Sequence, residues 1–255
     1  MIKAFIKHVL GADSDTLGLF GDTSAYYGTV EQQGRLTLHL HLLLWIRGGL
    51  TPDEARAKIM DPNSPFLQEL VKYLESTYNE DFLTGSKADV ESVIITAEAQ
   101  PEYIRPMQTM PEPPPEPCQK RCEACESCKS VKSWWQRFEK TVDDIIFRTH
   151  VHTCSSTRNK DDNIWGKCKA RFPRPTFDQS EVDLSTGHLN IKKNESSING
   201  FCAPLTYLFR CNTDVTSLRS GTAIKGVLLY VTKYVTKPSL KTFVAFDTVR
   251  SIFQK

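Results

Sequence analysis

The segment that most constrains the fold runs from His39 to Ile46, where two histidines bracket Leu40 and an unbroken apolar stretch follows. Side chains two residues apart on a β-strand point to the same face. A strand here therefore aims His39 and His41 at one spot, while Leu40 and Leu42 face the other side and suit a hydrophobic core. Because neutral imidazole is the commonest side-chain ligand of metal ions, the same strand is a candidate metal site.

An acidic residue and an amide precede the histidines at positions where a hairpin would bring them to the same face. Gly34 and Arg35 are typical of a turn between two strands. In such a hairpin, Glu31 and Gln33 share one face of the first strand and meet the histidines across it. Two imidazoles with one carboxylate or amide leave positions open for water and a phosphate oxygen, which suits divalent-ion chemistry on phosphates. A pair of histidines that binds no metal is the alternative.

A second motif lies further along the chain, where Tyr230 and Tyr234 are four residues apart and Lys233 and Lys237 each follow a tyrosine by three. The stretch begins after a glycine and stops at a proline, which predicts a helix over residues 222–237. Both tyrosines then lie on one helix face. The simplest alternative is an amphipathic helix with half-buried tyrosines and solvated lysines. The β-branched residues also permit a strand, which would likewise place both tyrosines on one face.

Taken together, these motifs resemble the Rep nuclease domain of Helitron rolling-circle transposons, a member of the HUH endonuclease superfamily, which is named for its His-hydrophobic-His motif. The first motif of that domain is matched by Glu31, Gln33, Gly34, Arg35, His39, His41 and Trp45. Its paired-tyrosine motif is matched by Tyr230, Tyr234 and Lys237. Residues 168–175 and 210–215 also look like that family. The motifs occur in the family's order, and the resemblance spans roughly residues 1–255.

The resemblance implies an α+β fold of the HUH type, in which helices flank a central antiparallel sheet and the histidine strand lies in its middle. The tyrosine helix would lie across the metal. The implied activity is metal-dependent nicking and strand transfer on single-stranded DNA through a 5′-phosphotyrosine intermediate, in rolling-circle transposition. The ligands of a catalytic Mg²⁺ or Mn²⁺ ion would be His39, His41, Glu31 and Gln33. The catalytic residues would be Tyr230, Tyr234, Lys237 and Lys233, with the lysines contacting phosphate oxygens or favouring the phenolate.

The same resemblance implies partners and a location. Single-stranded DNA at transposon ends would be the substrate, the protein would act in the nucleus, and the family normally carries a helicase domain on the same polypeptide. The sequence has no G-x-x-x-x-G-K-[S/T] loop, so we expect no unwinding by this chain itself. Because the strand expected before Phe5 is missing, we expect an N-terminally incomplete domain. The alternatives are a zinc-binding module that binds DNA without cleaving it, an inactive transposon remnant, and a metal-dependent phosphodiesterase that uses water.

Composition is ordinary for a globular protein, with 255 residues and a net charge of +2. This length suits one large domain or two small ones. Residues 1–117 carry a charge of −8 and residues 118–255 a charge of +10. A phosphate backbone would be drawn to the second part, unless the two parts interleave in the fold. The apolar runs are too short to span a membrane and no signal peptide is evident, so we expect reduced cysteines.

Composition shifts along the chain predict four segments. Residues 1–100 would form the first nuclease half with the histidine strand, and residues 176–255 the second half with the paired-tyrosine helix. Residues 101–117 hold 7 of the 14 prolines, which is typical of an extended or disordered linker. Residues 118–175 would be a Cys/His-rich insertion.

Helical spacing and capping signals predict three further helices, over residues 51–60, from residue 66 to about residue 78, and over residues 133–149. The apolar stripe of the third helix, from Trp134 to Ile146, is expected to lie in the core. The apolar run over residues 201–209 predicts a buried strand.

Four cysteines lie within one short stretch: Cys118, Cys122, Cys125 and Cys128. Overlapping C-x-x-C pairs in a reducing compartment are typical of metal sites. Four ligands so close in sequence rarely complete a tetrahedron alone, so we expect some of them to bind zinc with later ligands, drawn from His150, His152, Cys154 and Cys168. The alternatives are an iron–sulfur cluster and free thiols on a surface insertion. Cys202 and Cys211 are most simply core residues.

Overall fold

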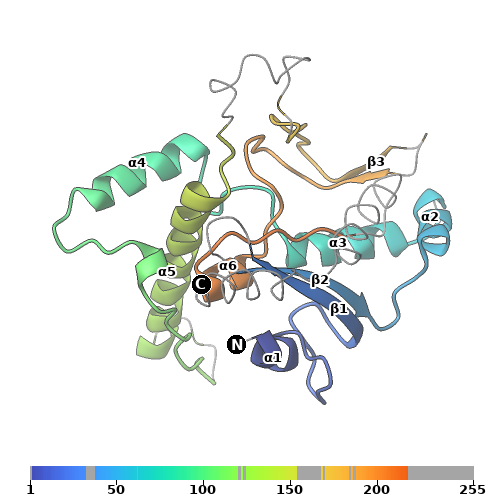
Figure 1. The fold of residues 1–255 in the computed structure, drawn as a ribbon, viewed down its shortest axis with the longest axis horizontal. Coiled ribbons are helices and arrows are strands. Elements are labelled where there is room, and N and C mark those ends of the chain that lie inside the picture. Colours follow the sequence, from blue (N-terminus) through green and yellow to red (C-terminus); the bar gives the residue numbers. More distant parts are fainter. Residues whose placement is uncertain are drawn as a thin grey trace, which may run out of the picture. The chain divides into compact units, whose positions relative to one another are not determined.

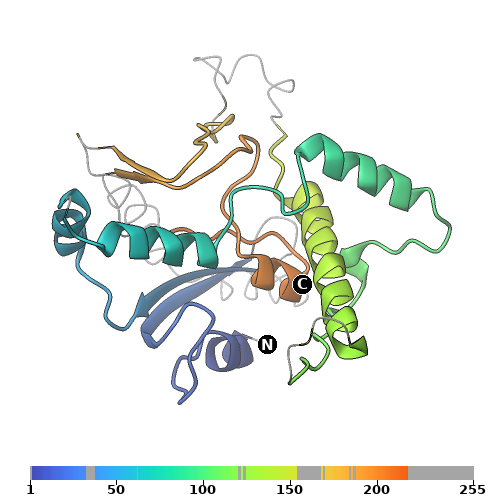
Figure 2. The same ribbon diagram turned by 180° about the vertical axis from the view of Figure 1, so that it is seen from behind.

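The computed structural model describes residues 2–32, 38–61, 63–119, 122, 125–153, 168, 170–183, 185 and 188–217. The chain divides into two compact units, which are drawn from two sides in Figures 1 and 2. The first unit comprises residues 1–62, 184–188 and 218–255, and the second comprises residues 63–183 and 189–217. The four segments expected from the sequence stay a prediction. No helix among the described residues is long and apolar enough to cross a membrane.

The first unit begins with a short helix, α1 (Ile2–Ala4), which continues as a π-helical turn, η1 (Phe5–Val9). The loop that follows brings Gly18 against the backbone of Leu10. A Cβ on Gly18 would lie 2.0 Å from the Leu10 carbonyl oxygen, so only glycine fits there. The Thr23 hydroxyl donates a hydrogen bond to the same oxygen at 2.5 Å, which ties the loop to the start of the next strand.

The histidines lie on a β-hairpin, as predicted. Strands β1 (Thr23–Gln32) and β2 (Leu38–Ile46) pair antiparallel, with an irregularity near Thr23. The predicted turn at residues 34–35 lies outside the described residues. Within the described part of the chain this sheet has two strands. The larger central sheet that the HUH resemblance implies is therefore not seen there, and the face carrying Leu40 and Leu42 is only half-buried.

Helix α2 (Pro52–Met60) follows the hairpin and confirms the first predicted helix. Thr51 caps it: the Glu54 amide donates to Thr51 Oγ1 at 3.3 Å, and the Thr51 amide donates to Glu54 Oε2 at 2.9 Å. These reciprocal bonds satisfy two of the backbone donors that a helix start leaves open. Proline in the first turn supports the same start, because its missing N–H is not needed there.

The second unit is mainly helical, and its longest helix, α5, contacts α4, α6 and η2. Its elements are α3 (Phe66–Thr77), α4 (Lys87–Glu98), the 3₁₀ turn η2 (Pro106–Gln108), α5 (Glu126–Thr149), β3 (Glu181–Asp183) and α6 (Ala203–Phe209). A second short strand, β4 (His188–Asn190), pairs with β3. Helices α3 and α5 confirm the predictions, although α5 begins seven residues earlier than predicted.

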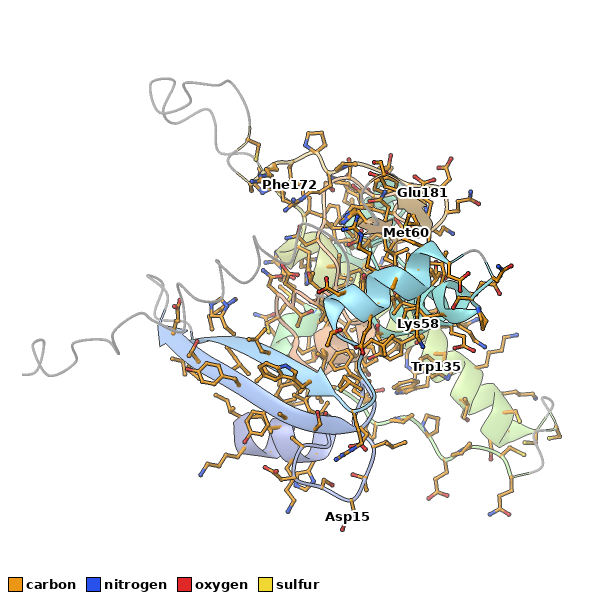
Figure 3. All side chains as sticks on the ribbon, turned by 90° about the vertical axis from the view of Figure 1, so that its right-hand side faces the viewer. Asp15, Lys58, Met60, Trp135, Phe172 and Glu181 are labelled. Carbon is orange, nitrogen blue, oxygen red and sulfur yellow. The ribbon has the colours of Figure 1, made fainter. Side chains whose placement is uncertain are left out.

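The core of the second unit forms along one face of α5. It comprises Phe82, Val90, Ile94, Trp134, Phe138, Val142, Ile146, Ile198 and Phe201. Trp134 and Phe138 stack with ring centroids 5.3 Å apart, so the predicted apolar stripe lies in the core. Trp135 is the exception: 51 % of it remains exposed on α5, where Figure 3 labels it.

One carboxylate in this core anchors a loop. Asp143 of α5 is buried and accepts hydrogen bonds from the Leu83 amide at 2.7 Å, the Thr84 amide at 2.8 Å and the Thr84 hydroxyl at 2.6 Å. Burial raises the pKa of the Asp143 carboxyl, and these three hydrogen bonds oppose that rise. The contact ties the chain before α4 to α5.

The prediction of a buried strand over residues 201–209 is wrong. Residues Ala203–Phe209 form helix α6, with Pro204 in its first turn. Only Phe201 keeps a strand-like pairing, through a bridge in which it exchanges backbone hydrogen bonds of 2.8 and 2.9 Å with Asn79. A short apolar run does not distinguish strand from helix, and proline is compatible with the start of either.

The Pro-rich segment is extended, as predicted, but it packs against side chains of α5 and α6. Pro106 is buried in η2. The Trp134 indole donates to the Glu112 carbonyl at 3.2 Å. The Tyr207 hydroxyl also lies 3.2 Å from both the amide nitrogen and the carbonyl oxygen of Glu112. Side chains from α5 and α6 therefore hold this segment.

Candidate metal centre

The register of the hairpin decides which side chains meet. Glu31 lies directly opposite His39, and Thr29 lies directly opposite His41. Residues that are paired across an antiparallel ladder, and residues two positions along from them, share a face. Glu31, His39 and His41 therefore lie together on one face of β1–β2, as the sequence predicted. Thr29 completes this group and was not predicted.

The side chains are close enough to act together. His41 Nε2 lies 3.7 Å from Glu31 Oε2, and the His39 and His41 ring centroids are 4.6 Å apart. Ligand atoms around one Mg²⁺ or Mn²⁺ ion lie about 3 Å apart, because each bond is about 2.1 Å long. The observed spacing therefore fits three donors to one divalent ion after small side-chain rotations. The Glu31 and His41 side chains are only 19 % and 16 % exposed, which limits competition from water.

The same face continues into exposed aromatic side chains. Tyr27 pairs with Leu43 further along the ladder, and Trp45 pairs with Ala25. Tyr27 is 44 % exposed and Trp45 is 50 % exposed. Exposed aromatic rings are surfaces on which other planar groups can stack. Trp45 entered the sequence argument only as part of a motif, and the place of Tyr27 on this face follows from the register.

The remaining residues of the predicted nuclease site lie outside the described residues. These are Gln33, Tyr230, Lys233, Tyr234 and Lys237. Their roles stay predictions.

Two described tyrosines have raised pKa values, which makes them poor candidates for a nucleophile. Burial, and then the Asp144 carboxylate, raise the pKa of Tyr103 to about 12. Tyr103 donates its hydroxyl to Asp144, which also accepts from Arg148. Burial likewise raises the pKa of Tyr78. Both phenols are held in the neutral form, which is the wrong direction for a nucleophile.

The cysteine-rich stretch forms a second cluster. The sulfur atoms of Cys118, Cys122, Cys125 and Cys128 all lie within 4.8 Å of one another. Four thiols in this arrangement can hold a metal ion such as zinc.

The structure separates the predicted zinc ligands into two groups. Cys125 and Cys128 lie at the start of α5, whereas His150 and His152 follow its end. A helix of 24 residues is about 36 Å long at 1.5 Å per residue, so the two ends cannot share an ion. The expectation that the cysteines need later ligands is therefore corrected.

At the far end of α5, His152 Nε2 lies 3.1 Å from Cys168 Sγ, and Cys154 lies outside the described residues. His150 is a structural residue: its ring bonds the Thr149 hydroxyl at 2.8 Å and its Nε2 lies 2.7 Å from the Thr213 carbonyl oxygen. Burial lowers the pKa of His150.

The two cysteines that we expected in the core differ in burial. Cys202 is buried, as predicted, whereas Cys211 is exposed. The prediction for Cys211 is wrong: this residue follows the end of α6, where the chain has left the core, so its side chain is accessible to solvent.

One protein family matches a segment of the chain that includes β1 and most of β2. The family described as "Helitron helicase-like domain at N-terminus" matches residues 1–44, a segment that contains Glu31, His39 and His41. The comparison shows a likeness to that family over residues 1–44 alone. Searches of curated proteins and of solved structures give no match.

Proposed function

We propose that this chain is a metal-dependent nuclease that nicks and rejoins single-stranded DNA through a 5′-phosphotyrosine intermediate, in Helitron-type rolling-circle transposition. The observation that carries the proposal is the grouping of Glu31, His39 and His41 on one hairpin face. The likeness of residues 1–44 to a Helitron domain supports the same assignment.

The hairpin would supply the metal ligands. Glu31, His39 and His41 would hold the ion through one carboxylate oxygen and two imidazole nitrogens, with Gln33 as a further candidate, and the ion would then be free to bind DNA phosphate oxygens as well. When bound, Mg²⁺ or Mn²⁺ polarises the scissile phosphate and offsets the charge that develops during attack. The rigid strand pair fixes the ligands before DNA arrives, so little reorganisation is needed.

The nucleophile would come from the paired tyrosines. A phenol has an ordinary pKa near 10, so Tyr230 or Tyr234 needs help to act at neutral pH, and Lys233 or Lys237 would favour the phenolate. The tyrosine oxygen bonds to phosphorus, the bond from phosphorus to the 3′ oxygen breaks, and that oxygen takes a proton. The step exchanges one phosphodiester for another and uses no water. A 3′-hydroxyl can therefore attack the phosphotyrosine and join strands again. A second tyrosine permits a second cut while the first end is held.

Two features of the chain would suit binding of a single strand. Tyr27 and Trp45 offer exposed rings for unpaired bases on the metal-binding face. The excess of positive charge in residues 118–255 would attract a phosphate backbone. The partners we propose are single-stranded DNA at transposon ends and a helicase domain, and the proposed location is the nucleus.

The experiment is a cleavage assay on the purified full chain with end-labelled DNA, in single-stranded and double-stranded forms, with Mn²⁺ or with a chelator. We expect nicking of single strands only, dependent on the ion. The His39→Ala/His41→Ala variant should lose at least about 100-fold in rate, because the loss of ligands removes the bound ion. His8→Ala is the matched control, since His8 is exposed and lies outside the cluster.

Other outcomes separate the alternatives. Cleavage that survives loss of both histidines would contradict the proposed site. Metal-dependent cleavage without a covalent product would identify a phosphodiesterase that uses water. DNA binding without any cleavage, from folded protein, would favour a binding module or an inactive remnant.

A further inference from the structure

Four cysteines lie where an extended segment meets the start of the longest helix. Residues 111–117, here called the proline strap, run along α5, and Cys118 follows the strap directly. Cys125 is the N-cap residue of α5, and Cys128 lies in its first turn. We propose that Cys118, Cys122, Cys125 and Cys128 together bind one zinc ion, and that this ion fastens the proline strap to the N-terminal end of α5.

The sulfur geometry fits a single tetrahedral ion. All four sulfur atoms lie within 4.8 Å of one another, and Cys118 Sγ lies 3.9 Å from Cys122 Sγ. With zinc–sulfur bonds of about 2.3 Å, the sulfurs of a Cys₄ site lie about 3.8 Å apart. The observed cluster needs only a slight contraction to reach this spacing. Zinc binding would displace the thiol protons to solvent, and the four thiolates would fill its coordination shell.

The same distances argue against the other chemistries. A disulfide bond is about 2.05 Å long, far shorter than the 3.9 Å between Cys118 and Cys122. In a [4Fe–4S] cluster each thiolate binds a different iron atom, and in a [2Fe–2S] cluster the four thiolates are divided between two iron atoms. Both arrangements spread the four sulfurs more widely than the ligands of a single ion. A closed set of four thiolates is typical of structural zinc and leaves no position for a substrate.

The helix contributes to the site. The Cys125 side chain makes no capping hydrogen bond, so its sulfur is available in a position that usually holds a capping oxygen. A zinc ion with four thiolates carries a net charge of −2, which the positive end of the α5 dipole stabilises.

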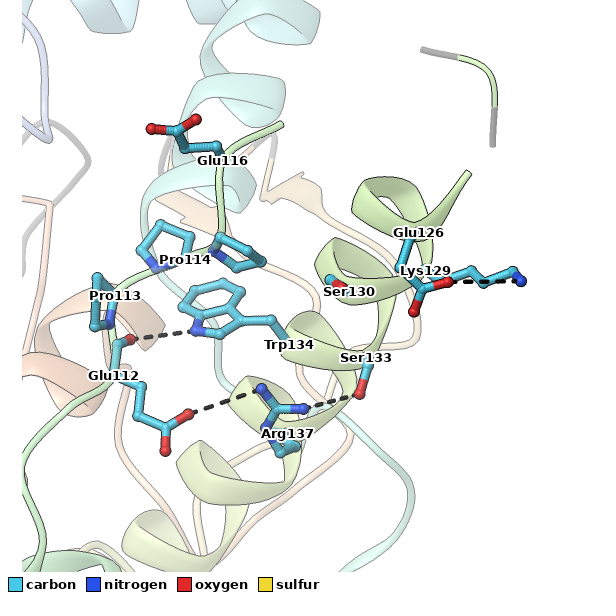
Figure 4. A pocket seen from close by; sticks show the side chains of 11 residues that line it. Glu112, Pro113, Pro114, Glu116, Glu126, Lys129, Ser130, Ser133, Trp134 and Arg137 are labelled. Carbon is cyan, nitrogen blue, oxygen red and sulfur yellow. Dashed lines mark hydrogen bonds and ion pairs between the residues drawn. The ribbon is translucent and has the colours of Figure 1, made fainter. Parts of the chain in front are cut away.

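The composition of the proline strap limits the backbone hydrogen bonds that it can donate. Five of its seven residues are proline, and proline has no backbone N–H to donate. The Glu112 end is held by Trp134 and Tyr207, and the Glu112 carboxylate lies 3.7 Å from Arg137. Beyond it, Figure 4 shows Pro113, Pro114 and Glu116 bordering an open pocket against α5. Zinc at the cysteines would anchor the end of the strap that lies past this pocket.

The proposed zinc ligands differ from the hairpin residues, and they lie at the other end of α5 from His152 and Cys168. His152 and Cys168 form their own pair after the end of α5, and the cysteine cluster uses none of the hairpin ligands. The proposal therefore does not depend on nuclease activity.

The test starts with metal analysis of the full chain purified under reducing conditions. We expect one zinc per chain and no iron, and replacement by Co²⁺ should give the visible absorption bands of a tetrahedral thiolate site. Cys125→Ser/Cys128→Ser should lose the ion. Cys211→Ser and Cys168→Ser should keep it, because those residues lie outside the cluster. Iron in place of zinc, or zinc that follows Cys168 instead of Cys125 and Cys128, would overturn the assignment.

A second measurement uses the unaltered protein, so it does not depend on whether a variant folds. Native alkylation followed by mass spectrometry should find the four cluster cysteines protected, and a chelator should expose all four together while Cys211 reacts throughout. Hydrogen exchange should then rise in peptides covering residues 111–133 and stay unchanged in β1–β2. Four cysteines that react equally with and without the chelator would refute the metal site. Zinc removal without any change in exchange over residues 111–133 would refute the fastening role.

Discussion

Glu31 lies directly opposite His39 in the β1–β2 ladder, and its carboxylate is 3.7 Å from His41 Nε2. This relationship depends on strand register. A slip of one residue would move every side chain of one strand to the other face and separate the carboxylate from both imidazoles. The candidate metal centre is therefore a property of the hairpin pairing, and the predictions below test what that pairing provides.

Replacing Glu31 by Gln keeps the shape of the side chain but removes its charge. We expect Mn²⁺ binding to weaken by about tenfold or more, since an amide is a poorer ligand than a carboxylate and even outer partners of metal sites contribute about 10–100-fold. Titration calorimetry measures the affinity. Asp22→Asn is the matched control, because it removes one charge from an exposed ion pair with Arg47 in the same unit. Equal effects of the two changes would mean that Glu31 is not a ligand.

Replacing Trp45 by Ala should weaken binding of single-stranded DNA by about 1–3 kcal/mol, the contribution of one base stacked on an aromatic ring. Fluorescence anisotropy with short labelled oligonucleotides measures this loss. Trp135→Ala is the control, since Trp135 is 51 % exposed against 50 % for Trp45 but lies on α5. If Trp135→Ala weakened DNA binding more than Trp45→Ala did, the DNA-binding surface would lie on α5 and not on the hairpin.

The Asp143→Asn substitution should destabilise the protein by about 1–3 kcal/mol. Asparagine has one acceptor oxygen in place of two, so at least one buried donor from Leu83 or Thr84 loses its partner. Denaturant unfolding measures the change. Glu139→Gln, an exposed change on the same helix, should alter stability by less than about 0.5 kcal/mol. A neutral result for Asp143→Asn would mean that the loop before α4 does not depend on this anchor.

His150 should make stability sensitive to mild acid. Burial lowers the pKa of His150 in the folded state, so the unfolded chain binds a proton more readily. The free energy of unfolding therefore falls as pH drops below the ordinary value of about 6.5, by at most about 1.4 kcal/mol per pH unit. Unfolding curves from pH 7.5 to 5 should show this fall, and His150→Gln should reduce it while His8→Gln should not. If the free energy of unfolding fell equally with pH in His150→Gln and in the unaltered protein, His150 would not be the cause of the acid sensitivity.

The local elements were the most predictable part of the fold. The hairpin and helix α2 carry their own signals, an alternating face in one case and a capping box around Thr51 in the other. Helix α4 carries a similar signal in Ser86 and Asp89, which the sequence reasoning did not use. Helix α6 was mistaken for a strand because its seven residues are too few for periodicity to decide.

Long-range packing was the part that sequence did not decide. Proline content predicts an extended backbone for residues 111–117, but the partner surface on Trp134 and Tyr207 depends on residues that are distant in sequence. The closure of four cysteines on one another depends likewise on Cys118 turning back toward the start of α5. For the metal centre, sequence alternation placed the histidines and Glu31 correctly on one face, while the contribution of Tyr27 required the register.

The most direct test of the central claim is to map the covalent product. The full chain would be incubated with single-stranded DNA and Mn²⁺, digested with nuclease and trypsin, and analysed by mass spectrometry. We expect a nucleotide joined through its 5′-phosphate to Tyr230 or Tyr234, and no such peptide from the His39→Ala/His41→Ala variant. DNA cleavage without any tyrosine adduct, or an adduct that persists when both histidines are lost, would contradict the account.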